Sequence, residues 1–158
     1  MKLSAELRAE IGDLYLRYIR CVDSASFEAW PDFFVDECVY ELKARENHDR
    51  GLPLALMQYE SKGMLRDRVY GITQTLYHQP YYQCHILGGL LIEPIADGEF
   101  AVEANYSVFR TKPGGVSELF NVGRYLDVVV RDGAVLKYRE KRCIYDSELV
   151  LNSVIYPI

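Results

Sequence analysis

Metal chemistry in this chain would have to start from three histidines, His48, His78 and His85. A mononuclear iron site needs two histidines that converge with a carboxylate. His78 and His85 stand on either side of Pro80, at a spacing that fits no helical or alternating-strand pair of ligands. A Rieske cluster needs two cysteines and two histidines, and beyond the adjacent Cys84 and His85 the matching second pair is missing. The sequence therefore predicts that this chain holds no metal.

Phosphate-binding loops and activated nucleophiles are missing from the sequence as well. Neither G-x-x-x-x-G-K-[ST] nor G-x-G-x-x-G occurs, and Gly88-Gly89 lies in a strand-like run, where it indicates a bulge or a bend. No G-x-S-x-G motif occurs. The four cysteines form no C-x-x-C pair, which is typical of buried or free thiols in a reducing compartment. These absences predict no cofactor-binding residue and no nucleophilic catalytic residue.

Acid–base chemistry is the alternative that the residue types leave open. Some small isomerases and dehydratases work inside a cone of helices and curled sheet with an aspartate, a histidine and a tyrosine. Asp23 and His85 would be two members of that set, and the third would be Tyr18, Tyr40 or Tyr106. The competing interpretation, which we favour, is that Asp23 only caps or turns the chain after the first helix.

The first half of the chain carries mainly helical patterns. The spacing of apolar residues predicts an amphipathic helix over 4–22, with Ser4 as its N-cap. A short second helix is expected after Ser26, and a longer helix over 62–76 is expected after the capping residue Ser61. Between them we expect a strand over 37–45, a loop over 46–53 and a short strand over 54–59.

The second half of the chain reads as four long strands, over 81–96, 99–112, 117–131 and 134–145. Asp97-Gly98 and Asp132-Gly133 predict tight hairpin turns between them, and hairpin connections make neighbouring strands antiparallel. Strands of this length must twist and curl. The expected fold class is α+β, with N-terminal helices packed on a long curved antiparallel sheet in a single domain over 1–158.

Composition limits the classes of partner. The chain has 49% hydrophobic residues and 18 basic against 23 acidic residues, a net charge of −5, which excludes a disordered chain and a nucleic-acid partner. No apolar run approaches a membrane span and the N-terminal residues resemble no signal segment, so we expect a cytoplasmic protein. The apolar tail over 147–158 is expected to dock on its own domain or on a neighbour, and many of the 13 tyrosines are expected at subunit contacts.

Short motifs in a fixed order run along essentially the whole chain. They are Trp30-x-x-Phe33-Phe34, Met64-Leu65-x-Asp67-Arg68-Val69, Tyr82-x-x-His85-Ile86, Gly123-x-Tyr125-x-Asp127 and Arg142-x-x-x-Asp146. This ordered set resembles the small (β) subunits of the aromatic-ring-hydroxylating oxygenases, which are Rieske non-haem iron enzymes. Further stretches are most similar to the salicylate 5-hydroxylase branch of that family, above all the closing Asn152-Ser153-Val154-Ile155-Tyr156-Pro157-Ile158.

The resemblance implies a cone-shaped NTF2-like (cystatin-like) fold, in agreement with the expected order of helices and sheet. It also implies a large (α) subunit as partner in an α3β3 hexamer. In that assembly the large subunit holds the Rieske [2Fe–2S] cluster, the mononuclear Fe(II) and the substrate, and it receives electrons from a ferredoxin and a reductase. This chain would be a structural, non-catalytic subunit, and the overall reaction would convert salicylate to gentisate with O2 and NADH-derived electrons.

Subunit contacts are the sites that such a structural chain should carry. Tyrosine, tryptophan, phenylalanine and arginine are enriched at protein interfaces. On that basis the expected interface residues are Trp30, Arg68, Tyr81, Tyr82, His85, Arg142 and Tyr156.

Overall fold

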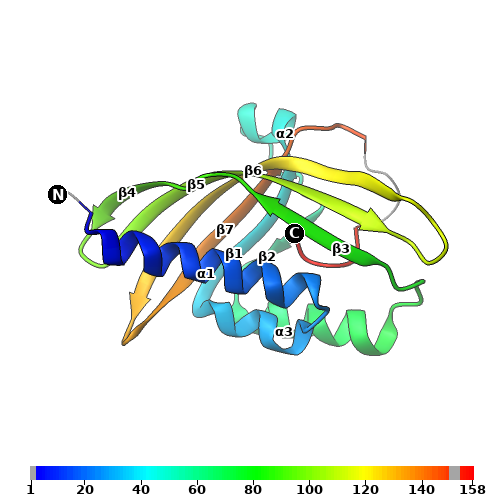
Figure 1. The fold of residues 1–158 in the computed structure, drawn as a ribbon, viewed down its shortest axis with the longest axis horizontal. Coiled ribbons are helices and arrows are strands. Elements are labelled where there is room, and N and C mark those ends of the chain that lie inside the picture. The colour runs from blue at the N-terminus through cyan, green and yellow to red at the C-terminus, as the bar shows by residue number, and fades with distance from the viewer. Residues whose placement is uncertain (1–2, 150–153) are drawn as a thin grey trace.

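The computed structural model describes residues 3–149 and 154–158. The helical elements are α1 (Ala5–Asp23), the 3₁₀ helix η1 (Phe27–Phe33), α2 (Arg45–Asp49), α3 (Lys62–Tyr70) and the π-helical turn η2 (Gly71–Thr75). The strands are β1 (Phe34–Ala44), β2 (Met57–Tyr59), β3 (Tyr82–Leu87), β4 (Leu91–Ala96), β5 (Glu99–Thr111), β6 (Ser117–Asp132) and β7 (Val135–Tyr145). Figure 1 shows α1 and α3 on one face of the long curved sheet that these strands form.

Capping hydrogen bonds mark both ends of helix α1. The Ser4 side chain accepts a hydrogen bond from the backbone N–H of Leu7, which satisfies one of the free donors of the first turn. At the other end the Ser24 hydroxyl donates to the carbonyl of Arg20. The predicted helix over 4–22 is therefore confirmed to within one residue at each end. Its buried face turns toward the sheet with the side chains of Ile11, Leu14, Tyr15, Tyr18, Cys21 and Val22.

The sheet is mixed, so the expectation of an antiparallel sheet is wrong for one pair of strands. The strand order is β2-β1-β7-β6-β5-β3, and β4 also pairs with β5. The pairs among β3 to β7 are antiparallel, as the hairpin turns predict. However, β1 pairs with β7 in parallel, with Tyr40 beside Lys141. A parallel neighbour needs a long connection rather than a turn, and the chain between β1 and β7 includes α2, α3, η2 and every other strand.

Several predicted boundaries also differ from the structure. The expected strand over 81–96 is divided into β3 and β4, and the break falls at the two glycines 88 and 89 that indicate a bend. The expected loop over 46–53 begins with the short helix α2, and the expected strand over 54–59 is reduced to β2. The helix predicted over 62–76 ends at Tyr70 and continues as the π-helical turn η2, although Ser61 caps it as expected.

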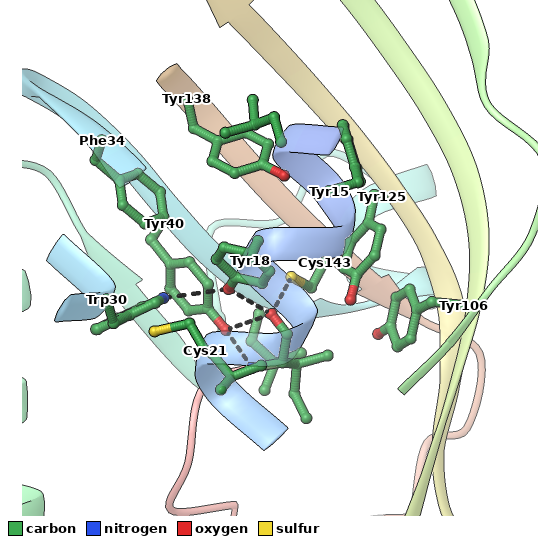
Figure 2. Close-up of a cluster of buried hydrophobic side chains, with 14 of the residues drawn as sticks. Tyr15, Tyr18, Cys21, Trp30, Phe34, Tyr40, Tyr106, Tyr125, Tyr138 and Cys143 are labelled. Carbon is green, nitrogen blue, oxygen red and sulfur yellow. Dashed lines mark hydrogen bonds between the residues drawn. The ribbon is translucent and has the colours of Figure 1, made fainter. Parts of the chain in front are cut away.

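The core between α1 and the sheet is built largely from aromatic rings (Figure 2). Eight of the thirteen tyrosines are at most 5% exposed: Tyr15, Tyr18, Tyr40, Tyr106, Tyr125, Tyr138, Tyr145 and Tyr156. The rings meet mainly edge to face, as Trp30 and Tyr40 do at 5.1 Å between centroids. The interpretation that many tyrosines lie at subunit contacts is therefore wrong for these eight, because they pack inside this chain.

Within the described part of the chain, no helix combines the length and the apolar character that crossing a membrane requires.

Candidate functional site

Asp23 and His85 form a contact that joins the end of α1 to the edge strand β3. The Asp23 Oδ2 atom accepts a hydrogen bond of 2.9 Å from the backbone N–H of His85. Its Oδ1 atom lies 2.5 Å from His85 Nδ1. The carboxylate therefore satisfies an edge-strand donor that no strand pairs with, and it also orients the imidazole ring. Two residues separated by 62 positions are brought together as the acid–base alternative requires.

The surroundings of the pair allow only part of that chemistry. The His85 side chain has no exposed surface, and its Nε2 atom is buried without a hydrogen-bond partner in the described structure. The Asp23 side chain is 20% exposed. Both residues line an open surface hollow of ≈ 1110 Å³ beside α1, together with residues such as Cys21, Ser24 and Cys84. The hollow gives the carboxylate access to solvent, but the imidazole lies beneath the surface.

The hydroxyl groups of the tyrosines expected beside this pair form hydrogen bonds with other parts of the chain. The Tyr18 and Tyr40 hydroxyls donate to the backbone carbonyl of Ile158, at 2.9 and 3.3 Å. The Tyr106 hydroxyl donates to Asn121 Oδ1 at 2.6 Å. Burial raises the pKa of each of these three phenols well above its ordinary value, so they stay neutral. None of the three therefore completes the set of aspartate, histidine and tyrosine.

The centre of the cone holds a buried ion pair that sequence reasoning missed. Lys141 Nζ lies 3.0 Å from Asp127 Oδ2, and neither side chain has any exposed surface. The ammonium also lies 3.5 Å from the centroid of the Tyr125 ring, a cation–π contact. The Tyr15 hydroxyl donates to the same Asp127 oxygen at 2.5 Å. Strand alternation was the available signal, because Asp127 stands on β6 at an inward position between Tyr125 and Val129.

Residues 154–158 dock between the sheet and the helices, as expected for an apolar tail (Figure 1). Ile158 is completely buried, and its backbone N–H donates to the Tyr40 hydroxyl at 2.8 Å. Gln83 Nε2 donates to the Pro157 carbonyl at 3.4 Å, and Arg68 donates to the Ile155 carbonyl at 2.8 Å. This segment is therefore part of the core of the chain, and backbone hydrogen bonds hold it in place.

The residues expected at the interface differ widely in exposure. Trp30, His85 and Tyr156 are at most 6% exposed, so they face the interior of this chain. Arg68 and Tyr81 are half-buried and contact the segment 154–158. Arg142 keeps 33% of its side chain exposed while it binds Glu41 and Glu140. Tyr82, at 76% exposed, is the most open member of the set.

An exposed apolar patch accompanies Tyr82 on the face of the sheet that points away from α1. Cys84 on β3 pairs with Phe109 on β5, which pairs with Leu119 on β6. Further along these strands, Ser107 on β5 pairs with Ile86 on β3 and with Val122 on β6. We name as the outer patch the exposed large side chains Tyr82, Ile86, Phe109, Leu119 and Val122. Apolar residues at outward positions of these strands were the signal that could have predicted it.

In the ranges 3–149 and 154–158, no group of three or more histidine, cysteine, aspartate or glutamate residues is placed to hold a metal ion.

Comparisons with known proteins agree on one group of relatives. The family model of the SnoaL-like domain matches residues 4–142. The anthranilate 1,2-dioxygenase small subunit of Burkholderia cepacia is 38% identical over 149 residues, which cover 94% of this chain and 92% of that protein. A terephthalate 1,2-dioxygenase terminal oxygenase subunit, beta 2, of a Comamonas species is 28% identical over 141 residues, covering 89% and 92%.

Similar solved structures include members of the same group. The chain superposes with a TM-score of 0.87 and 35% identity on a beta subunit described as that of an aromatic-ring-hydroxylating dioxygenase from Novosphingobium aromaticivorans, covering 96% and 97% of the two chains. The beta subunit of the benzoate 1,2-dioxygenase from Burkholderia mallei, at 15% identity and a TM-score of 0.76, shows the shared fold alone. The chain belongs to the SnoaL-like family, and its fold is the NTF2-like cone. Within that family it is a small subunit of an aromatic-ring-hydroxylating dioxygenase.

Proposed function

We propose that this chain is the structural small subunit of an aromatic-acid hydroxylase, and that its partner is a large oxygenase subunit in an α3β3 hexamer. The observation that carries the proposal is the 38% identity over 94% of the chain to the anthranilate 1,2-dioxygenase small subunit. In this proposal the Rieske [2Fe–2S] cluster, the mononuclear Fe(II) and the substrate belong to the large subunit. A ferredoxin and a reductase deliver electrons to that subunit, and this chain supports the assembly.

Salicylate is the aromatic acid that we propose for the complex. The motifs that end in Tyr156-Pro157-Ile158 resemble the salicylate 5-hydroxylase branch. Support also comes from the relative named for anthranilate, because anthranilate and salicylate are both benzoates with one small polar group next to the carboxylate. The product would be gentisate, formed by insertion of one oxygen atom from O2 while the other is reduced to water by electrons from NADH.

The outer patch is the surface that we propose for the contact with the large subunit. It joins five exposed large side chains on three neighbouring strands, Tyr82, Ile86, Phe109, Leu119 and Val122. Contiguous exposed apolar side chains of this kind mark interaction sites in soluble proteins. Tyr82 also supplies the aromatic anchor that interface cores favour.

Co-expression with a Rieske-type large subunit from the same genome tests the proposed function. We expect the two chains to elute together at the mass of a hexamer, with all iron in the large chain and salicylate hydroxylation only in the complex. The isolated small chain should contain no stoichiometric iron. Iron bound by the isolated chain, or a full-activity large subunit that never associates with this chain, would contradict the proposal.

A stand-alone isomerase or dehydratase is the second candidate, and the Asp23–His85 contact is the observation that favours it. If this candidate were right, the purified chain alone would turn over a small cyclic substrate, and Asp23→Asn would abolish that turnover. We expect instead that Asp23→Asn leaves the hydroxylase activity of the assembled complex within a factor of about two, because the pair would then serve only to join α1 to β3. Turnover by the isolated chain that disappears in Asp23→Asn would favour the second candidate.

A further inference from the structure

The Tyr156 side chain occupies an enclosed slot made by other parts of the chain. Its ring lies 4.4 Å from the Tyr81 ring and 4.7 Å from the Phe27 ring, measured between centroids, with interplanar angles of 31° and 34°. The Tyr156 hydroxyl lies 2.8 Å from His78 Nε2. Only 5% of the residue is exposed. Both the ring and the hydroxyl of Tyr156 are therefore bound specifically.

The groups that form the slot belong to segments remote from Tyr156. Phe27 lies in η1 near the start of the chain, while His78 and Tyr81 lie in the segment between η2 and β3. Other hydrogen bonds to the segment 154–158 go to its backbone, as those of Arg68 to the Ile155 carbonyl and of Gln83 to the Pro157 carbonyl do. The segment is thus bound as a peptide ligand would be, with backbone hydrogen bonds for affinity and a side-chain pocket for specificity.

We propose that Phe27, Tyr81 and His78 form a binding slot for a phenolic ring, and that this chain fills the slot with its own Tyr156. The ligand class is a phenol with a small apolar group opposite the hydroxyl, of which p-cresol is the side-chain analogue of tyrosine. This slot goes beyond the proposed function, because it lies in this chain and does not depend on the substrate of the complex.

The chemistry of the slot selects a phenol over an unsubstituted ring. Aromatic neighbours tilted by 31° and 34° favour any flat ring through dispersion and quadrupole contacts. The imidazole nitrogen of the half-buried His78 then provides a partner for one hydroxyl group, and a bound ring without a hydroxyl would leave that nitrogen without this partner. In the natural chain Tyr156 is tethered at a high effective concentration, so a free phenol in solution does not displace it.

The variant Tyr156→Ala tests the proposal, because it empties the slot and leaves its walls in place. The probe is p-cresol, and the readout is the thermal unfolding midpoint of the full chain. With p-cresol at about five times its dissociation constant, we expect the midpoint of Tyr156→Ala to rise by about 2–4 °C, since the ligand binds only the folded form. The natural chain and the control variant Tyr77→Ala, which removes a fully exposed tyrosine, should show no such rise.

Preference for p-cresol over toluene would distinguish a slot for a phenol from a cavity that binds any apolar ring. Toluene has the shape of p-cresol without the hydroxyl, and we expect Tyr156→Ala to bind p-cresol about 2- to 10-fold more tightly than toluene. The double variant Tyr156→Ala/His78→Ala should bind the two compounds equally. Equal binding by the single variant, or no binding of p-cresol at all, would overturn the proposal.

Loss of folding would not prevent the test. If Tyr156→Ala is recovered unfolded, the yield of folded protein is measured after refolding with and without millimolar p-cresol or toluene. Higher recovery with p-cresol than with toluene supports the slot, because a ligand of the folded state shifts the folding equilibrium toward it. Equal recovery with the two compounds, or no recovery with either, counts against it.

Discussion

Lys141 and Asp127 place a full pair of charges at the centre of an aromatic core. The Lys141 ammonium lies within 5.0 Å of the ring centroids of four tyrosines, Tyr15, Tyr18, Tyr125 and Tyr138. Desolvation of two buried charges costs several kcal/mol, and only close pairing with further hydrogen bonds offsets that cost. Asp127 has those bonds, because its second oxygen accepts from the backbone N–H of Arg142 at 3.1 Å.

Removal of one member of this ion pair should destabilise the fold far more than the small net contribution of the pair to stability suggests. We expect Lys141→Met to lower the free energy of unfolding by about 3–5 kcal/mol, because the buried Asp127 carboxyl would lose the positive charge that offsets the cost of its burial. The double variant Lys141→Met/Asp127→Asn should cost less than the sum of its two single variants. Urea unfolding of the four proteins measures the difference. A Lys141→Met chain as stable as the natural chain would contradict this account.

Glu41 is a second buried acid, and its surroundings predict a dependence of stability on pH. Burial raises the pKa of Glu41, but hydrogen bonds from Lys43 and Arg142 outweigh burial and hold the pKa below its ordinary value of 4.5. A carboxyl group with a depressed pKa in the folded state stabilises the fold above its unfolded pKa. That contribution is lost as the pH falls from 4.5 through the lower folded value.

The variant Glu41→Gln should therefore be less stable than the natural chain by about 1–2 kcal/mol near neutral pH. The difference between the two chains should shrink as the pH falls below 4.5, because the natural carboxyl group also becomes neutral as the pH passes its lower folded pKa. Urea unfolding across this pH range provides the measurement, with the exposed Glu93→Gln as the control. A stability difference that is the same at both ends of the range would show that the charge of Glu41 is unimportant.

At the scale of elements, the contact between β6 and β7 depends on a glycine. A Cβ atom on Gly123 would lie 2.0 Å from the Ile144 carbonyl oxygen and 2.7 Å from Tyr145 Cα. Both are backbone atoms of β7, which no rotamer change can move aside. Gly123 therefore permits the close approach of the two strands that carry Asp127 and Lys141.

Two substitutions of glycine by alanine should change the stability of the chain in opposite directions. Gly123→Ala should destabilise the chain by about 3 kcal/mol, because the strands must separate to admit the methyl group. Gly12→Ala, inside α1 with no atom within 4 Å of the new Cβ, should stabilise it by about 0.5–1 kcal/mol. Thermal and urea unfolding of both variants check these values. A destabilising Gly12→Ala, or a harmless Gly123→Ala, would show that the local geometry is different.

Elements set by near neighbours in the chain agree with their sequence patterns, and elements set by remote partners do not. The turns after Asp97 and Asp132 occur as predicted, with φ of +70° at Gly98 and +61° at Gly133. The parallel pairing of β1 with β7 has no local signal, because both strands alternate in the same way whichever direction their neighbour runs. The helix predicted over 62–76 is longer than α3, which ends at Tyr70. The helical spacing of apolar residues does not distinguish an α-helix from the π-helical turn η2 that follows it.

At the scale of the whole molecule, the open face of the sheet is where the proposed partner would bind. We expect Ile86→Lys to weaken association with the large subunit by at least about 10-fold, because a charge would be buried in the contact. The stability of the isolated chain should hardly change, since Ile86 is 53% exposed. Size-exclusion chromatography of the co-expressed chains measures association. The control Leu16→Lys alters a similarly exposed residue on α1 and should leave the complex intact. Loss of assembly in both variants, or in neither, would contradict the assignment of the outer patch.

The sequence by itself determined the fold class, the capped first helix, the hairpins and the family, because each depends on periodicity, turn chemistry or an ordered set of motifs. Only the tertiary structure decided which side chains meet. It brought Asp23 to His85 across 62 residues and Lys141 to Asp127 at the centre of the cone. It also placed Tyr156 between the rings of Phe27 in η1 and Tyr81 just before β3, inside the chain rather than at an interface. The physical reason is that local patterns are set by neighbours a few residues away, whereas a long-range contact depends on how all elements share one limited volume.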